Sequence, residues 1–172
     1  MVEPLRLKIV KALCAKLEEI EAPGYNFTLS GNVFRGRATF GADDPLPMVS
    51  ILEDPQALAP QAPPKFTSEP VRTATMNLLV QGWAEKPIQS PDNGTDNAYY
   101  LLSDVQRKLA EIVQDRGPNG GFLSDMVENL LIGEPVVRPP DETSDAAWFW
   151  LRVTVNYVEN LADPTWMPYS DH

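Results

Sequence analysis

The chain of 172 residues is long enough for one domain with a buried core, and 43% of its residues are hydrophobic. Its formal charge of −10 at pH 7 argues against a nucleic-acid binder, because phosphate binding needs clustered lysine and arginine. The single cysteine, Cys14, excludes an internal disulfide and a cysteine-based zinc site. No apolar run approaches the ~20 residues of a membrane span and no signal-peptide pattern opens the chain, so we expect a protein made in the cytoplasm.

The negative charge is unevenly distributed along the chain. Residues 1–40 carry six basic and four acidic side chains, which gives +2, whereas residues 41–172 carry eight basic and twenty acidic ones, which gives −12. Two interpretations fit this excess. It either forms a surface that repels DNA phosphates, or it only keeps the protein soluble.

The first third of the chain predicts one helix and three short strands. Residues 4–20 follow a helical period, with Pro4 in the first turn and a Pro-Gly stop at 23–24. The apolar side of this helix holds Ile9, Val10, Leu13, Cys14, Leu17 and Ile20. Residues 25–29 and 33–37 flank a Ser-Gly-Asn turn and predict a hairpin. Residues 48–53 predict another strand, bounded by prolines.

A proline-rich segment follows. Residues 45–70 contain seven of the seventeen prolines, and the core of this stretch, residues 54–65, is neither a helix nor a central strand. We interpret residues 54–70 as an extended loop that orders against a neighbouring subunit, because proline restricts the free chain and lowers the entropy lost on docking. Its candidate contact residues are Pro60, Pro63 and Pro64.

The middle of the chain predicts a strand and the main helix. Residues 74–85 form a long strand with apolar side chains on both faces, which is typical of a central strand. Residues 98–116 form a helix capped by Thr95 or Asp96. The apolar stripe of this helix consists of Leu101, Leu102, Val105, Leu109, Ile112 and Val113.

The last third ends in the longest predicted strand. Residues 122–132 predict a short helix or a turn, and 134–138 a brief strand. Residues 146–160 alternate with period two and form a strand much longer than the ~5–6 residues of an ordinary one. At roughly 3.3 Å per residue it could reach about 50 Å. Residues 163–172 form a tail with the aromatic residues Trp166 and Tyr169. One face of the long strand carries Phe149, Leu151, Val153, Val155 and Tyr157, and the other carries Trp148, Trp150, Arg152, Thr154 and Asn156.

This order predicts an α+β fold: one mostly antiparallel β-sheet with two main helices packed on one face, in a single domain that covers residues 1–172. The proline-rich loop at 54–70 and the tail at 163–172 extend from it. Trp148, Trp150 and Arg152 either pack under a helix or face a neighbouring subunit, where tryptophan and arginine are favoured anchors. The candidate interface residues are Trp148, Trp150, Arg152, Pro60, Pro63, Pro64, Trp166 and Tyr169.

No pattern of catalytic residues is apparent. The only histidine is His172, the last residue, so we expect neither a catalytic triad nor a histidine-ligated metal. The acidic pairs at 43–44, 53–54 and 141–142 either hold a divalent ion or are solvated turn residues. We therefore expect no enzymatic activity, no cofactor and no metal site.

The order and character of the elements resemble a known family. The strand Met-Asn-Leu-Leu-Val-Gln-Gly-Trp-Ala-Glu at 76–85, the helix at 98–109 and the strand at 148–160 follow an N-terminal amphipathic helix and a small hairpin. This arrangement, over residues 5–160, resembles the tail terminator (tail completion) proteins of long-tailed bacteriophages. The loop at 54–70 and the tail beyond Asp163 have no counterpart in the resemblance.

The resemblance implies a structural protein of the virion, located in the tail or neck and made in the host cytoplasm. It implies a homo-oligomeric ring, a hexamer in this family, that stops growth of the tail tube. The partners would be the tail-tube protein and the head-completion or connector protein, with DNA passing the lumen unbound and no membrane involved. The alternatives are another neck or tail-tube component such as a head-closure protein, a small enzyme using paired carboxylates, and a monomeric binding module.

Overall fold

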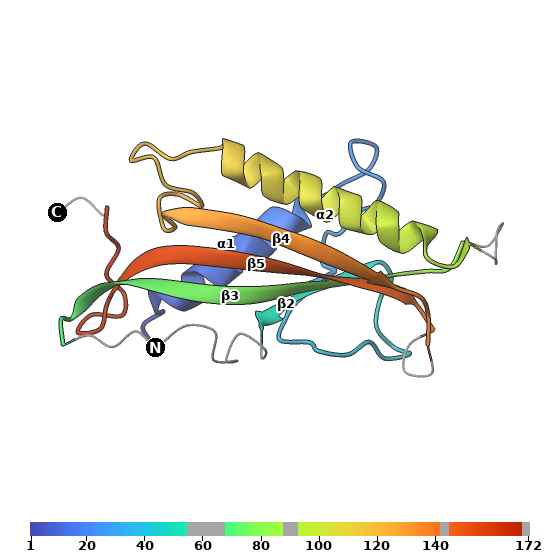
Figure 1. Cartoon of the computed structure of the whole chain (residues 1–172), viewed down its shortest axis with the longest axis horizontal. Coiled ribbons are helices and arrows are strands. Elements are labelled where there is room, and N and C mark those ends of the chain that lie inside the picture. Colours follow the sequence, from blue (N-terminus) through green and yellow to red (C-terminus); the bar gives the residue numbers. More distant parts are fainter. Residues whose placement is uncertain (55–67, 88–92, 142–144, 170–172) are drawn as a thin grey trace.

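A computed structural model of the chain describes residues 1–54, 68–87, 93–141 and 145–169. These residues form two helices and five strands (Figure 1). In chain order they are α1 (Leu5–Glu18), β1 (Val33–Arg35), β2 (Met48–Glu53), β3 (Val71–Ala84), α2 (Asp96–Gln114), β4 (Asn129–Arg138) and β5 (Ala147–Asn160). The strands at 48–53, 74–85 and 146–160 and both main helices are thus confirmed to within a few residues.

The strands form one sheet in the order β1-β2-β3-β5-β4. Only the β1–β2 pair is parallel, and the other pairs are antiparallel, so the α+β prediction is confirmed. The centre of the sheet is the β3–β5 pair, whose register runs without a break from Val71↔Asn160 to Ala84↔Ala147. At roughly 3.3 Å per residue, these fourteen paired residues span about 45 Å. This long pair sets the long dimension of the molecule (Figure 1).

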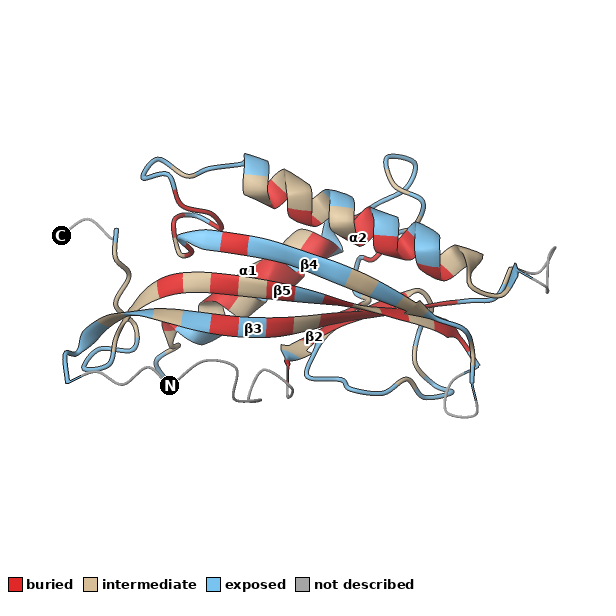
Figure 2. Cartoon of the chain, viewed as in Figure 1, coloured by how far each residue is buried: buried red, intermediate tan, exposed pale blue. Residues whose placement is uncertain are grey.

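Both helices pack on the same face of the sheet, where they bury a single apolar core (Figure 2). Leu13 and Leu17 of α1 and Val105 and Leu109 of α2 are all fully buried in it. The strands contribute alternate residues, as the period of two requires. These are Val49, Ile51, Met76, Leu78, Val80, Phe149, Leu151, Val153, Val155 and Tyr157.

Neither helix has a side-chain hydrogen bond from its N-cap residue. Pro4 takes the N-cap position of α1, and the Leu5 N–H donates to the Pro164 carbonyl 2.8 Å away, in the C-terminal segment. Thr95 is the N-cap of α2, but its side chain makes no capping hydrogen bond. Asp96 in the first turn faces the positive end of the helix dipole instead.

The hairpin predicted at 25–37 is wrong. Residues 25–29 form no strand, because the segment turns toward α2, where the Phe27 N–H and the Asn26 amide donate to the Asp104 carboxylate at 3.0 and 2.8 Å. β1 instead pairs in parallel with β2. The twelve residues from 36 to 47 supply the crossover that a parallel pair needs.

The short helix predicted at 122–132 is also wrong, whereas the alternative of a turn is confirmed. Residues 122–127 form a tight turn closed by a bridge between Phe122 and Val127. Strand β4 then starts at Asn129, earlier than the brief strand expected at 134–138. Leu130 is buried whereas Leu131 is 52% exposed and Ile132 is 37% exposed, as expected of an edge strand and not of a helix that buries an apolar stripe.

Candidate functional site

The two tryptophans of β5, Trp148 and Trp150, lie on the sheet face opposite the helices. Trp148, Trp150 and Arg152 alternate with Phe149 and Leu151, which are completely buried under α1 and α2. The alternative in which the tryptophans pack under a helix is therefore wrong. We call the face that carries Trp150, Arg152 and the residues beside them on β3 the open face, and its use as an interface stays a prediction.

A second, small apolar cluster covers one end of the open face. Met48, Trp83 and Ala146 are buried there, and Trp148 packs against them. Phe40 and Leu46, from the crossover segment, complete the cluster, and the Phe40 and Trp83 rings stack with centroids 6.4 Å apart. Trp148 is therefore partly a core residue, because it fixes the crossover segment to the sheet.

Trp150 continues the aromatic surface past this cluster. Its ring meets the Trp148 ring edge to face, with centroids 5.2 Å apart. It remains partly exposed. Two buried polar atoms nearby, the Trp148 indole nitrogen and the Gln81 side-chain oxygen, have no hydrogen-bond partner among the described residues. Aromatic side chains such as the partly exposed Trp150 are enriched at surfaces that bind another chain.

Arg152 is anchored at the point where the proline-rich segment begins. Its Nε donates to the Asp54 carboxylate at 2.7 Å. The Asp54 side chain is 6% exposed and that of Arg152 is 57% exposed, so the guanidinium is held in place yet accessible. Pro60, Pro63 and Pro64 lie outside the described residues. Further along the face, hydrogen bonds from Thr154 to Asn77 and from Thr75 to Asn156 replace the aromatic contacts.

The predicted tail residues lie at the other end of the molecule. The C-terminal segment folds back after β5, where the Leu161 N–H donates to the Pro70 carbonyl and Asp163 forms a bridge with Asn160. Trp166 is half-buried and Tyr169 is 44% exposed. About twelve residues of β5, or roughly 40 Å, separate this end from Trp148 (Figure 1). The sequence-predicted interface residues that the structure describes thus form two separate groups.

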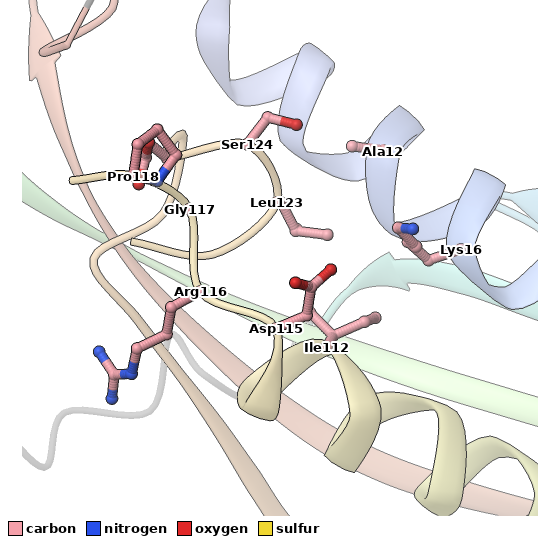
Figure 3. A pocket seen from close by; sticks show the side chains of 10 residues that line it. Ala12, Lys16, Ile112, Asp115, Arg116, Gly117, Pro118, Leu123 and Ser124 are labelled. Atoms are coloured by element: carbon pink, nitrogen blue, oxygen red, sulfur yellow. The ribbon is translucent and has the colours of Figure 1, made fainter. Parts of the chain in front are cut away.

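A cavity lies between α1, the end of α2 and the turn after it (Figure 3). Its volume is about 390 Å³, and Ala12, Lys16, Ile112, Asp115 and Leu123 are among its lining residues. Arg116 points away from it, and its guanidinium bonds the Gly120 carbonyl and stacks on Phe122. Lys16 is paired with Glu19 at 3.2 Å. The charged groups around this cavity therefore hold the chain in place.

The wall of this cavity contains an unusual backbone turn. Leu123, Ser124 and Asp125 all have positive φ angles of 50–60°, a conformation that costs a non-glycine residue about 1–2 kcal/mol. The buried Asp125 carboxylate stabilises the turn by accepting hydrogen bonds from the Gly121 N–H at 2.9 Å and from the Asn119 backbone and side chain. Gly117 approaches this carboxylate so closely that a Cβ there would lie 2.4 Å from it. This carboxylate therefore has a structural role.

Three members of the acidic pairs named above form ion pairs with arginines. Asp44 pairs with Arg37, Glu53 pairs with Arg6 at 2.8 Å, and Asp54 bonds Arg152. Among the described residues, no three histidine, cysteine or acidic side chains are grouped to hold a metal ion. Glu142 and His172 lie outside the described residues.

The groups with displaced pKa values join the two helices to the segment between them. The Tyr25 hydroxyl donates to Glu111 at 2.7 Å, and this hydrogen bond lowers the pKa of Glu111. The Lys108 ammonium lies 2.8 Å from Glu19, which lowers the pKa of that carboxyl. Burial raises the pKa of the Cys14 thiol to about 11. Cys14 is 8% exposed in the core side of α1, so it is an unreactive thiol and not a nucleophile.

Sequence reasoning missed the outer edge of β4. This strand is the last in the sheet, and Leu131, Ile132 and Val136 are exposed along it. The register with β5 breaks between Ile132 and Pro135, which leaves Gly133 and Glu134 in a bulge. Residues 130–132 form a continuous apolar run, and a short run of this kind does not distinguish a strand from a helix.

A scan against protein-family models and a search of curated proteins both find no match for this chain. In the described part of the chain, neither helix has the length and apolar character needed to cross a lipid bilayer.

Proposed function

We propose that this protein is a structural component of a bacteriophage tail. In this proposal copies of the chain form a ring, a hexamer, at the head-proximal end of the tail tube. The ring stops polymerisation of the tube and offers a surface to the head-completion or connector protein. The observation that carries the proposal is the β3–β5 pair, about 45 Å long, whose helix face is closed and whose other face is partly exposed.

Two further features support an assembly role. Three of the exposed apolar side chains, Leu131, Ile132 and Val136, lie on one edge strand, β4, and isolated monomers rarely leave such an edge uncovered. The open face combines Trp150 with an accessible Arg152, the residue types that dominate protein interfaces. The acidic excess of residues 41–172 supports the DNA part of the proposal, because a negative lumen repels phosphates.

The test is to assemble tails with and without the protein. With purified tail-tube protein, electron microscopy should show tubes of uncontrolled length, and adding this protein should cap one end and stop growth. Native mass spectrometry of the capped ends should give a closed homo-oligomer. A protein that stays monomeric and never enters a tail would contradict the proposal and favour a monomeric binding module. Caps on the head side that leave tube length unchanged would favour a head-closure protein.

The proline-rich segment gives a second test of the same proposal. Deleting residues 56–63 should leave the fold intact, because the segment lies outside both helices and all five strands. If the segment orders against a neighbouring subunit, the deletion should weaken ring formation. The unfolding midpoint of the monomer serves as the control. If ring formation is unchanged, the segment acts only as a linker.

A further inference from the structure

Two opposite edges of the sheet carry apolar surfaces with complementary charges. One is the outer edge of β4, and the other is a groove between α1 and the β1–β2 edge. β4 and β1 are the two edge strands, so these surfaces lie at opposite edges of the sheet. Because they are different surfaces, a contact between them would be heterologous, and repetition of it closes into a ring when the rotation allows.

The groove arises because β1 is shorter than β2. β1 has three residues and pairs with Val49, Ser50 and Ile51, so the last residues of β2 have no neighbour on that side among the described strands. The groove has a volume of about 360 Å³. Its lining includes Leu7, Val10, Arg35, Ile51, Leu52 and Glu53. It is apolar at its base and carries charged groups at its rim.

The charge at the rim is positive. Arg6 bonds Glu53 with both nitrogen–oxygen distances at 2.9 Å or less, so these two charges neutralise each other. Arg35 is exposed and forms no salt bridge within the described part of the chain. One guanidinium beside an apolar groove therefore lacks a counter-charge.

The edge of β4 has the complementary pattern. Glu134 stands in the bulge between exposed apolar residues, with Leu131 and Ile132 on one side and Val136 on the other. Glu134 and Glu128 are both exposed, and neither has a salt-bridge partner in the described ranges. The β4 edge therefore offers one carboxylate among apolar side chains, and the groove offers one arginine beside an apolar base. The two surfaces are complementary in charge.

The same features disfavour pairing of β4 with a second β4. Pro135 lacks an N–H, and the bulge at 133–134 twists the edge, so a continuous ladder of backbone hydrogen bonds cannot form along it. An antiparallel β4–β4 contact centred on the bulge would also bring the two copies of Glu134 together, which is unfavourable. The occupant of the β4 edge must instead present apolar side chains and a positive charge.

We infer that the β4 edge of one copy docks into the α1–β2 groove of a second copy, with Glu134 beside Arg35 of the neighbour. This deepens the proposed ring and rests on it for closure, whereas the contact itself needs only two copies. The partner is a second copy of this chain because the chain itself carries both halves of the complementary pair.

Engineered disulfides test this contact. In a Cys14→Ala background, Arg35→Cys and Glu134→Cys are made as separate variants and mixed under mild oxidation. The mixture should give covalent dimers, each variant alone should not, and a chain with both substitutions should give a ladder that ends at the ring size. Tyr99→Cys, on an exposed position of α2 away from both surfaces, mixed with Arg35→Cys measures random collision. Folding of each variant is checked by circular dichroism.

A charge exchange supplies the second arm. Glu134→Arg should weaken self-association about tenfold or more, and adding Arg35→Glu should restore it. Both arms are run on the protein alone and on protein assembled on tail tubes. Covalent dimers from Glu134→Cys alone, or no excess over the collision control in either setting, would overturn the contact. Tubes that are capped without the cross-link would refute the contact but support the proposed function. Cross-linked rings that leave the tubes growing would support the contact but refute the proposed function.

Discussion

The two faces of the β3–β5 pair come from the same two strands but have different surroundings. On the helix face, Phe149, Leu151 and Val155 are fully buried under α1 and α2. On the open face, aromatic residues give way along the strand to Arg152 and then to threonine and asparagine, and most of these side chains keep some exposure. The alternation therefore defines which residues share a face, while the helices define which face is closed. The partly exposed aromatic end is the part left for a partner.

The largest expected effect comes from opening the closed face. Phe149→Ala should destabilise the protein by about 3–5 kcal/mol, because it leaves a cavity beneath both helices. Urea unfolding followed by circular dichroism measures this change. The Phe149 ring also fills the space over Gly82, where an added Cβ would lie 2.2 Å from it. Gly82→Ala should therefore be destabilising alone and much less so in the Phe149→Ala background. Equal costs in both backgrounds would contradict this packing.

Truncating the helix side of the same core should cost slightly less. Leu109→Ala should lower the free energy of unfolding by about 2–5 kcal/mol, since Leu109 is fully buried. Tyr99→Ala on the same helix is the control, because Tyr99 is 58% exposed and should change stability by about 0.5 kcal/mol or less. A loss below roughly 0.5 kcal/mol for Leu109→Ala would place its stripe outside the core.

Two neighbouring residues of β5 allow a direct comparison of the faces by matched substitutions. Val153 is 1% exposed on the helix face, and Thr154 on the open face donates to Asn77 at 3.1 Å. Val153→Thr buries a hydroxyl and should cost about 1–3 kcal/mol. Thr154→Val makes the reverse change in shape and should cost about 0.5 kcal/mol or less. Thermal unfolding of the pair measures the difference, and equal effects would mean that both faces are covered.

The smallest effect is a pH dependence that reports on the α1 side of the core. Burial holds the pKa of Cys14 at about 11, above the ordinary 9.0 of the unfolded chain. The protonated thiol therefore favours the folded state, and this contribution is complete below pH 9 and is lost as the pH rises through 11. The stability lost between neutral pH and pH 10 is roughly 1 kcal/mol. Cys14→Ala should reduce the alkaline loss of stability by that amount, measured by denaturant unfolding at pH 7 and 10. An unchanged slope would place the thiol in solvent.

Less of the open face than of the closed face could be predicted from the sequence. Trp148, Trp150 and Arg152 were grouped correctly by alternation, but their exposure depended on where the helices packed. Trp148 turned out to be shared between a small core and the surface, because Phe40 and Leu46 return over the sheet from a crossover. The β4 edge was missed because a short apolar run does not distinguish a strand from a helix. Trp166 and Tyr169 could not be placed from sequence, since only the fold brings the tail back to α1.

The sequence by itself determined the elements whose residues repeat with a clear period. The stripe from Leu101 to Ile112 and the alternation from Phe149 to Tyr157 each have one solution, because burying them requires a helix and a strand respectively. Only the tertiary structure decided the partner of β1, the covered face of β5 and the direction of residues 25–29. Those choices depend on contacts between residues far apart in the chain, such as Asp104 with Phe27, and no local pattern carries that information.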